Sequence, residues 1–303
     1  METVTEKPQS NFKRQDIQQL VTDTIIGQLE AGTIPWQKPW TGGEHLPLGL
    51  PRNAVTKKWY RGINIVLLWS SSMKNAYQSD EWASFKQWND QKEMLRKGEK
   101  GSLVVYYDTF EKEVDGEKEK IPFLKSSYVF NRCQLKSFVA GEKKNKPVGA
   151  DFVLKMYDVD DFIENTQAII EHDGLGARYI PSEDKIIMPH MEQFVATTTC
   201  SATEGYYSTL LHELTHWTKK KERLNRIGGK KFGDSNYALE ELIAEFGAAF
   251  LCAGFCIATL EKGDHAGYIE NWLRVLKENK QFLFTAASEA SKAVEYLYGL
   301  QPT

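Results

Sequence analysis

The sequence predicts an α+β protein of two domains, and three observations support this prediction. Segments with apolar residues at helical spacing alternate with short runs typical of β-hairpins. A polar stretch containing Gly and Pro, residues 141–150, indicates a linker between residues 1–140 and residues 151–303. Residues 1–146 carry 23 Lys and Arg against 18 Asp and Glu, whereas the remainder carries 15 against 23. A mildly basic front half and an acidic back half suggest two separate tasks.

The front half is predicted to contain helices and one hairpin. Apolar residues at helical spacing, with Gly32 as a stop for the first helix, define the helices, and alternating residues define the strands. The expected elements are helices at 11–32, 63–69 and 82–88 and strands at 102–109 and 122–131. The tip of the hairpin contains Asp115-Gly116. A basic turn at 96–101 leads into the first strand and could contact phosphate.

The back half is predicted to be mainly helical with a second hairpin. Its expected elements are a helix from about Val159, strands at 177–180 and 184–188, and helices at 203–222, from 237, at 265–281 and at 286–300. Thr203 is the expected cap of the helix at 203–222. Residues 185–188 are the candidate edge strand to which an extended peptide could add. A hairpin with a purely structural role fits the same pattern equally well.

The helix at 203–222 contains the motif that points most directly to chemistry. His212 and His216 are four residues apart, so both imidazoles lie on one helix face and can bind one zinc ion. Glu213 lies beside them, too close in sequence to be a comfortable third ligand. It is well positioned to take a proton from a metal-bound water.

A second acidic motif follows in the next predicted helix. A zinc site of this kind needs a third protein ligand and an open position for water. Glu241 can be that ligand, and Glu245, one turn later, can accept the outer N–H of a ligating histidine. Glu240 is an adjacent competitor for ligation, and an ordinary solvated helix face is the alternative for all three acids. The apolar run from Phe246 favours a buried helix, in which a carboxylate needs a partner.

Together, HELTH and the later EELIAE resemble the motifs of gluzincin metallopeptidases. The resemblance implies His212, His216 and Glu241 as metal ligands, Glu213 as catalytic base and Glu245 as support for a histidine. It implies one zinc per chain, with manganese or cobalt as possible replacements in vitro. Tyr237 or His265 is a weaker candidate for stabilising a transition-state oxyanion.

The front half combines aromatic residues with cations. Six of the eight tryptophans lie before residue 147. Aromatic faces stack on unpaired bases while Lys and Arg neutralise phosphates, so this composition is typical of proteins that bind single-stranded DNA. The alternative is that these tryptophans form the core of a small domain. The candidate DNA-binding residues are Trp36, Lys38, Trp40, Arg52, Lys57, Trp59, Tyr60, Arg61, Lys97, Lys100 and Arg132.

The front half also resembles a known family. The series PWQKPW, N-x-x-T-x-x-x-Y-R-G-I-N, RKGEKG and VFN-x-x-Q-L is similar to the N-terminal single-stranded-DNA-binding domain of ArdC-type antirestriction proteins of conjugative plasmids. In that family this domain precedes a zincin-like peptidase domain, which is the order found here. The resemblance implies binding of the incoming strand during conjugation and protection of plasmid DNA from host restriction.

Composition sets further expectations. No apolar run is long enough for a membrane span and Met1–Ser10 is polar, so we expect a cytoplasmic protein without a signal peptide or membrane partner. The four cysteines, Cys133, Cys200, Cys252 and Cys256, show no CxxC spacing and are expected to be buried free thiols.

The residues predict binding of single-stranded DNA and a zinc-dependent peptidase domain, and the family resemblance implies an antirestriction protein. Its expected partners are single-stranded DNA and an unknown protein substrate or host restriction component. The alternative is a non-proteolytic protein that coats single-stranded DNA and has a structural or vestigial metal site. A sequence-specific regulator is disfavoured because the chain has no recognisable helix-turn-helix.

Overall fold

The computed structural model describes residues 16–37, 49–114, 117–140, 152–197, 200–226, 235–257 and 265–302. Both helices and sheets are present, as the α+β prediction requires. The predicted linker at 141–150 lies outside the described residues. No helix in the described part of the chain is long and apolar enough to cross a membrane.

The described residues of the front half form a four-stranded sheet with α-helices packed around it. In chain order the elements are α1 (Ile17–Glu30), β1 (Arg52–Asn53), α2 (Ile63–Asn75), β2 (Glu81–Ala83), α3 (Phe85–Asp90), β3 (Ser102–Val114) and β4 (Glu117–Asn131). The strand order is β1-β2-β4-β3. The helix predicted at 82–88 is wrong at its start, because Trp82 and Ala83 pair with β4 as strand residues. Ser84 then caps α3 through a capping box with Gln87.

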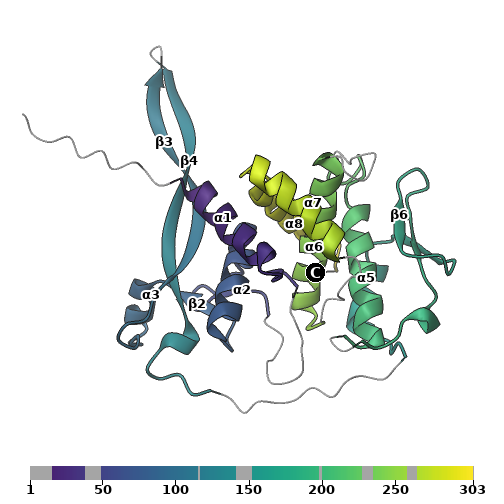
Figure 1. Ribbon diagram of the computed structural model, residues 1–303, viewed down its shortest axis with the longest axis horizontal. Helices are drawn as coiled ribbons and strands as arrows, with labels where there is room; N and C mark the ends of the chain where they lie inside the picture. Colours follow the sequence, from purple (N-terminus) through teal and green to yellow (C-terminus); the bar gives the residue numbers. More distant parts are fainter. Residues whose placement is uncertain are drawn as a thin grey trace, which may run out of the picture.

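The predicted hairpin is confirmed and is longer than expected. Strands β3 and β4 pair antiparallel from Ser102 opposite Val129 to Val114 opposite Glu117. Figure 1 shows this hairpin extending well beyond the rest of the molecule. The lower part of the hairpin is anchored, because Val104 and Val129 pack with Leu68 of α2 in a buried cluster.

The described residues of the back half form a small sheet and several α-helices. Its elements are α4 (Tyr157–Glu164), β5 (Ile169–His172), β6 (Arg178–Ile180), β7 (Lys185–Met188), α5 (Ala202–Trp217), α6 (Ser235–Gly254), α7 (His265–Glu278) and α8 (Phe282–Gly299). The predicted hairpin of β6 and β7 is confirmed. Two details are corrected. Ser201, not Thr203, caps α5, with Glu204 completing a capping box. Strand β7 lies between β5 and β6, so it is not an edge strand.

The two halves share one hydrophobic core. Val21 and Ile25 of α1 belong to the same buried cluster as Phe250, Trp272 and Leu283 of the back half. Figure 1 shows α1 lying between the hairpin and helices α7 and α8. Burial of these faces removes apolar area from water, at roughly 25 cal/mol per Å². The front helices are therefore part of the structure that supports the back half.

Helices α5 and α6 pack with almost no space between them. A Cβ atom added at Gly247 of α6 would lie only 2.7 Å from Oγ1 of Thr215, which is completely buried in α5. A residue larger than glycine at this position would push the helices apart. Gly247 therefore sets how closely the acidic residues of α6 approach the histidines of α5.

Asp184 joins the small sheet to the end of α5. Its carboxylate forms ion pairs with Arg223 and with Lys220, whose Nζ lies 2.8 Å away, and accepts a hydrogen bond of 2.9 Å from Oη of Tyr179 in β6. The Arg223 hydrogen bonds and the Lys220 hydrogen bond outweigh partial burial and hold the pKa of Asp184 well below its usual value.

We predict that Asp184→Asn lowers the free energy of unfolding by about 1.5–3 kcal/mol at pH 7, the range of hydrogen bonds to charged groups. Because the folded-state pKa is depressed, this stabilisation is present above the unfolded pKa of about 3.9 and is lost as the pH falls below it. Urea unfolding at pH 7 and pH 3 measures both effects. If the difference in unfolding free energy between wild type and Asp184→Asn is as large at pH 3 as at pH 7, or larger, the stabilising role given to the Asp184 carboxylate is wrong.

Candidate metal centre

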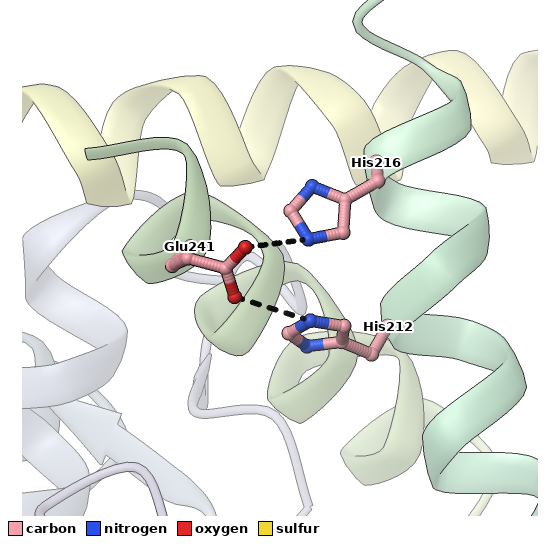
Figure 2. Close-up of side chains that lie close together, drawn as sticks. All are labelled: His212, His216 and Glu241. Atoms are coloured by element: carbon pink, nitrogen blue, oxygen red, sulfur yellow. Dashed lines mark ion pairs between the residues drawn. The ribbon is translucent and has the colours of Figure 1, made fainter. Parts of the chain in front are cut away.

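The histidines of the HELTH motif lie on the buried face of α5. Both His212 and His216 are 6% exposed. Their rings meet edge to face with centroids 4.8 Å apart. Figure 2 shows both side chains extending from α5 toward Glu241, which comes from α6. The four-residue spacing thus brings two imidazoles to one point, as the helix geometry requires.

Glu241 faces the same ring nitrogen of both histidines. One of its oxygens lies 3.7 Å from Nε2 of His212 and the other lies 3.5 Å from Nε2 of His216. These ligand atoms all lie within 4.8 Å of one another. Two imidazoles and one carboxylate are the ligand set typical of a catalytic zinc site.

The opposite nitrogen of each ring faces a different carboxylate. Nδ1 of His216 lies 3.1 Å from Oε1 of Glu240, and Nδ1 of His212 lies 3.6 Å from Oε1 of Glu245. A carboxylate at the outer nitrogen fixes the tautomer and orientation of a metal-binding histidine. Glu240 is therefore directed at the back of His216, and only Glu241 faces both Nε2 atoms.

Arg226 balances the charge of Glu240. Its guanidinium lies 2.9 Å from Oε1 and 3.1 Å from Oε2 of that carboxylate, and both side chains are about 5% exposed or less. Arg226 also donates to the backbone oxygen of Thr215 and the hydroxyl of Thr218. The loop after α5 thus returns to the metal helix and stabilises one of its acidic partners.

The electrostatics of the site fit a bound cation. Burial alone would lower the pKa of His216, but hydrogen bonds to Glu240 and Glu241 outweigh it and raise the pKa to about 9. Burial would likewise raise the pKa of Glu241, yet the imidazoles of His212 and His216 that face it lower it. A positive charge is therefore strongly favoured between these side chains, and a divalent metal ion would supply it.

A cleft of about 450 Å³ opens beside these side chains. Glu213 lines it and is 7% exposed. Within the described part of the chain, no group donates a hydrogen bond to its carboxylate or forms an ion pair with it. Tyr237 also lines the cleft, whereas the side chain of His265 lies outside the described residues.

Strand β6 forms one wall of the cleft. Arg178 and Tyr179 of β6 and the preceding Ala177 line it, and among the described strands β6 pairs with β7 alone, which makes it an edge of the small sheet. A peptide in extended form can add to such an edge. The edge strand beside the metal site is thus β6 in place of the predicted residues 185–188.

The structure places the predicted DNA-binding residues in three kinds of environment. Trp36 is only 2% exposed and packs edge-on against Phe246 and Trp272, so in this conformation its ring cannot stack on a base. Tyr60 is partly buried against the core. Trp59, by contrast, is 52% exposed. Lys38 and Trp40 lie outside the described residues.

The remaining predicted residues are cations at the surface. Arg61 forms an ion pair with Glu295 of α8, and Lys97 and Lys100 lie exposed on the turn before β3. The other three are Arg52, Lys57 and Arg132, and all three contact Glu81.

Glu81 organises a cluster of three cations. Its carboxylate lies 2.6 Å from Nη1 of Arg132, 3.0 Å from Nζ of Lys57 and 3.4 Å from Nη2 of Arg52. Burial would raise the pKa of Glu81, but Arg132 and Lys57 outweigh it and lower the pKa. The carboxylate is buried while the three cations are partly exposed, so they stay available to an anion outside.

The cysteines differ slightly from expectation. All four are free thiols, and Cys133, Cys200 and Cys252 are buried as predicted. Cys256 is exposed, and it follows the end of α6 in a left-handed backbone conformation.

Some residues of the site had no signal in the sequence. Arg226 looks like an ordinary loop cation, and Gln37 lies 208 residues from Glu245, to which its amide donates a hydrogen bond of 3.1 Å. Glu240 was recognisable only as a competitor of Glu241. These residues are recruited by tertiary packing and not by a local motif.

Two family models match the chain. The model of the N-terminal domain of anti-restriction factor ArdC matches residues 15–130. A model of zincin-like metallopeptidases matches residues 157–289, which contain all the side chains of Figure 2.

Individual proteins match over nearly the whole chain. The uncharacterized protein y4eC of Sinorhizobium fredii (strain NBRC 101917 / NGR234) is 30% identical over 295 residues, which cover 94% of this chain and 92% of y4eC. DNA primase TraC of Escherichia coli is 31% identical over 93% of this chain, but the match covers only 27% of TraC.

Two crystal structures of the antirestriction protein ArdC from plasmid R388 are similar to this structure. Both are 37% identical in sequence and cover 94% of this chain and 98% of the ArdC chain. The TM-score is 0.79 for the metal-free ArdC structure and 0.75 for the Mn(II)-bound one.

We predict different effects for the two adjacent acids of α6. Glu241→Ala should abolish zinc binding, because it removes a ligand, whereas Glu240→Gln should weaken it about 10–100-fold, the usual effect of removing an outer partner. Elemental analysis and chelator competition measure this, with circular dichroism as a folding check. Exposed Glu222→Gln is the control. Loss of zinc from Glu240→Gln but not from Glu241→Ala would reverse the assignment.

Proposed function

Because this chain belongs to the ArdC family of antirestriction proteins, we propose that it binds single-stranded DNA and cleaves a protein substrate at a zinc site. In this proposal it protects incoming plasmid DNA during conjugation, and its substrate is a host restriction component or another protein met on DNA. Because the DNA-binding face and the peptidase site belong to one chain, a substrate protein on the same DNA is present at a high local concentration.

The observation that carries the peptidase proposal is the position of the Glu213 carboxylate, which lines the cleft beside three convergent metal donors. A purely structural metal site needs no such group. Glu213 lines the same cleft as His212, His216 and Glu241. Zinc held by those three residues would supply a Lewis acid that polarises a carbonyl and lowers the pKa of water to about 7.

The residues of this chain then divide the remaining work. Glu213 accepts a proton from the attacking water at its carboxylate and later passes it to the leaving amine. Glu240 and Glu245 keep the two imidazoles in the tautomer that presents Nε2 to the cleft. Strand β6 aligns the substrate backbone by pairing with it as an added strand.

We expect Glu213→Gln to retain zinc and to reduce proteolysis and antirestriction by at least 100-fold, because general-base catalysis contributes about 10²–10⁴-fold. Zinc content, cleavage of a protein substrate in the presence of DNA, and conjugation into a restricting host are the measurements. Exposed Glu222→Gln is the matched control. Full antirestriction by Glu213→Gln would favour the alternative, a non-proteolytic coat with a structural metal site.

The DNA-binding proposal is supported by one face of the front sheet. Trp59 pairs with Arg52 in an antiparallel bridge, and Arg52 of β1 pairs with Glu81 of β2. The side chains of Trp59, Arg52 and Glu81 therefore point to the same face of the sheet. On β4, Tyr128 and Phe130 lie two residues apart and therefore share a face. Phe130 pairs with Ala83, which lies two residues after Glu81 in β2. Tyr128 and Phe130 therefore point to the same face as Glu81.

This face presents what a single strand requires. Trp59, Phe85 and Tyr128 are each more than half exposed, and the Glu81 cluster holds cations beside them. The other face of the sheet is covered, because Trp82 and Val129 pack against Leu68 of α2. Helix α3 covers the Ala83 end of the first face, where Trp88 packs with Ala83 and Leu135, and Trp59, Phe85 and Tyr128 remain exposed beside it. Exposed rings can stack on unpaired bases, and the cations beside them can contact phosphates. This arrangement favours binding of a single strand over a duplex.

We predict that Trp59→Ala weakens binding of a single-stranded oligonucleotide by about tenfold, since stacking on an aromatic contributes about 1–3 kcal/mol per base. Arg132→Ala should weaken binding and reduce its dependence on salt. Fluorescence anisotropy at several salt concentrations tests both. Phe152→Ala, an exposed aromatic of the back half, is the control. Equal loss for Phe152→Ala, or preference for duplex, would argue against this face.

A further inference from the structure

A turn from the front half reaches the metal site. Residues 34–37 follow α1, and the backbone N–H of Gln37 donates to the oxygen of Ile34, which closes the turn. Trp36 and Gln37 both line the cleft that contains His212 and Glu213. The cleft is therefore built from both halves of the chain.

The Gln37 side chain makes a specific contact there. Its Nε2 donates a hydrogen bond of 3.1 Å to Oε2 of Glu245, and both residues are buried, at 7% and 8% exposed. The other oxygen of Glu245 faces Nδ1 of His212 at 3.6 Å. Gln37, Glu245 and His212 thus form a chain of contacts that ends at Nδ1 of a candidate metal-binding histidine, the ring atom opposite the one that faces Glu241.

The turn is held rigidly enough to orient this amide. Trp36 packs edge-on against Phe246, the residue after Glu245, with ring centroids 4.8 Å apart, and against Trp272 of α7 at 5.5 Å. Trp36 is thus wedged between α6 and α7, and the next residue has little freedom. A donor fixed by packing can determine how a buried carboxylate is turned.

We propose that Gln37 is a positioning residue of the metal site: its amide orients the Glu245 carboxylate, which in turn orients His212 toward the metal. This inference rests on the proposed zinc site. It also means that the front half supplies part of that site, so metal binding depends on a residue outside the zincin-like match at 157–289. An outer partner of this kind typically affects metal affinity about 10–100-fold.

The test measures zinc affinity of the full chain by competition with a chromogenic chelator. Gln37→Met keeps the length of the side chain and removes the donor, and Gln37→Leu is a second variant in case the first does not fold. Gln28→Met is the matched control, because the Gln28 amide bonds to Ser70 in the front half. We expect zinc affinity to fall at least tenfold in the Gln37 variants and to be unchanged in the control.

Two further readouts separate positioning from general support. Without metal, Gln37→Met and Gln28→Met should have similar melting temperatures in thermal unfolding. In a double-mutant cycle, Glu245→Gln and Gln37→Met should weaken zinc binding by less together than the sum of their separate effects, because both act through one contact. Wild-type affinity in a folded Gln37 variant, or full additivity, would overturn the inference. Absence of zinc from the wild-type chain would overturn the proposed metal site itself.

Discussion

The constraint on which the site depends is the burial of several negative charges beside two imidazoles. Isolated buried carboxylates are unstable, so each needs a cation, a proton donor or a metal. The four carboxylates are Glu213, Glu240, Glu241 and Glu245. Arg226 supplies one positive charge, to Glu240. A divalent ion between Glu241 and the histidines would balance two more of the four negative charges. One negative charge would remain, on the carboxylate that accepts protons.

The convergence of His212, His216 and Glu241 was largely predictable because it depends on local periodicity. The spacing of His212 and His216 fixes their common face wherever the helix lies. The assignment of Glu241 needed a second helix, and the structure separates it from Glu240 because neighbouring residues on a helix point about 100° apart. Gln37 and Arg226 were not predictable, since only the packing of distant segments brings them to the site.

The fold shows the same division. Long periodic helices and the β3–β4 hairpin were predicted, whereas strand β2 was read as part of a helix because it has only three residues. The strand order β5-β7-β6 could not be predicted from the sequence either. The parallel pairing of β5 with β7 has no recognisable pattern in the residues of β7. Trp36 and Trp59 look alike in sequence, yet one is in the core and the other at the surface.

The close contact between the halves also bears on how such a protein can be inherited. A shared core and a turn that reaches the metal site mean that neither half could be exchanged alone without exposing apolar surface. The match to TraC spans 93% of this chain within 27% of a much larger protein, so both halves recur there together. The unit that these proteins share is therefore the whole two-part body and not either half alone.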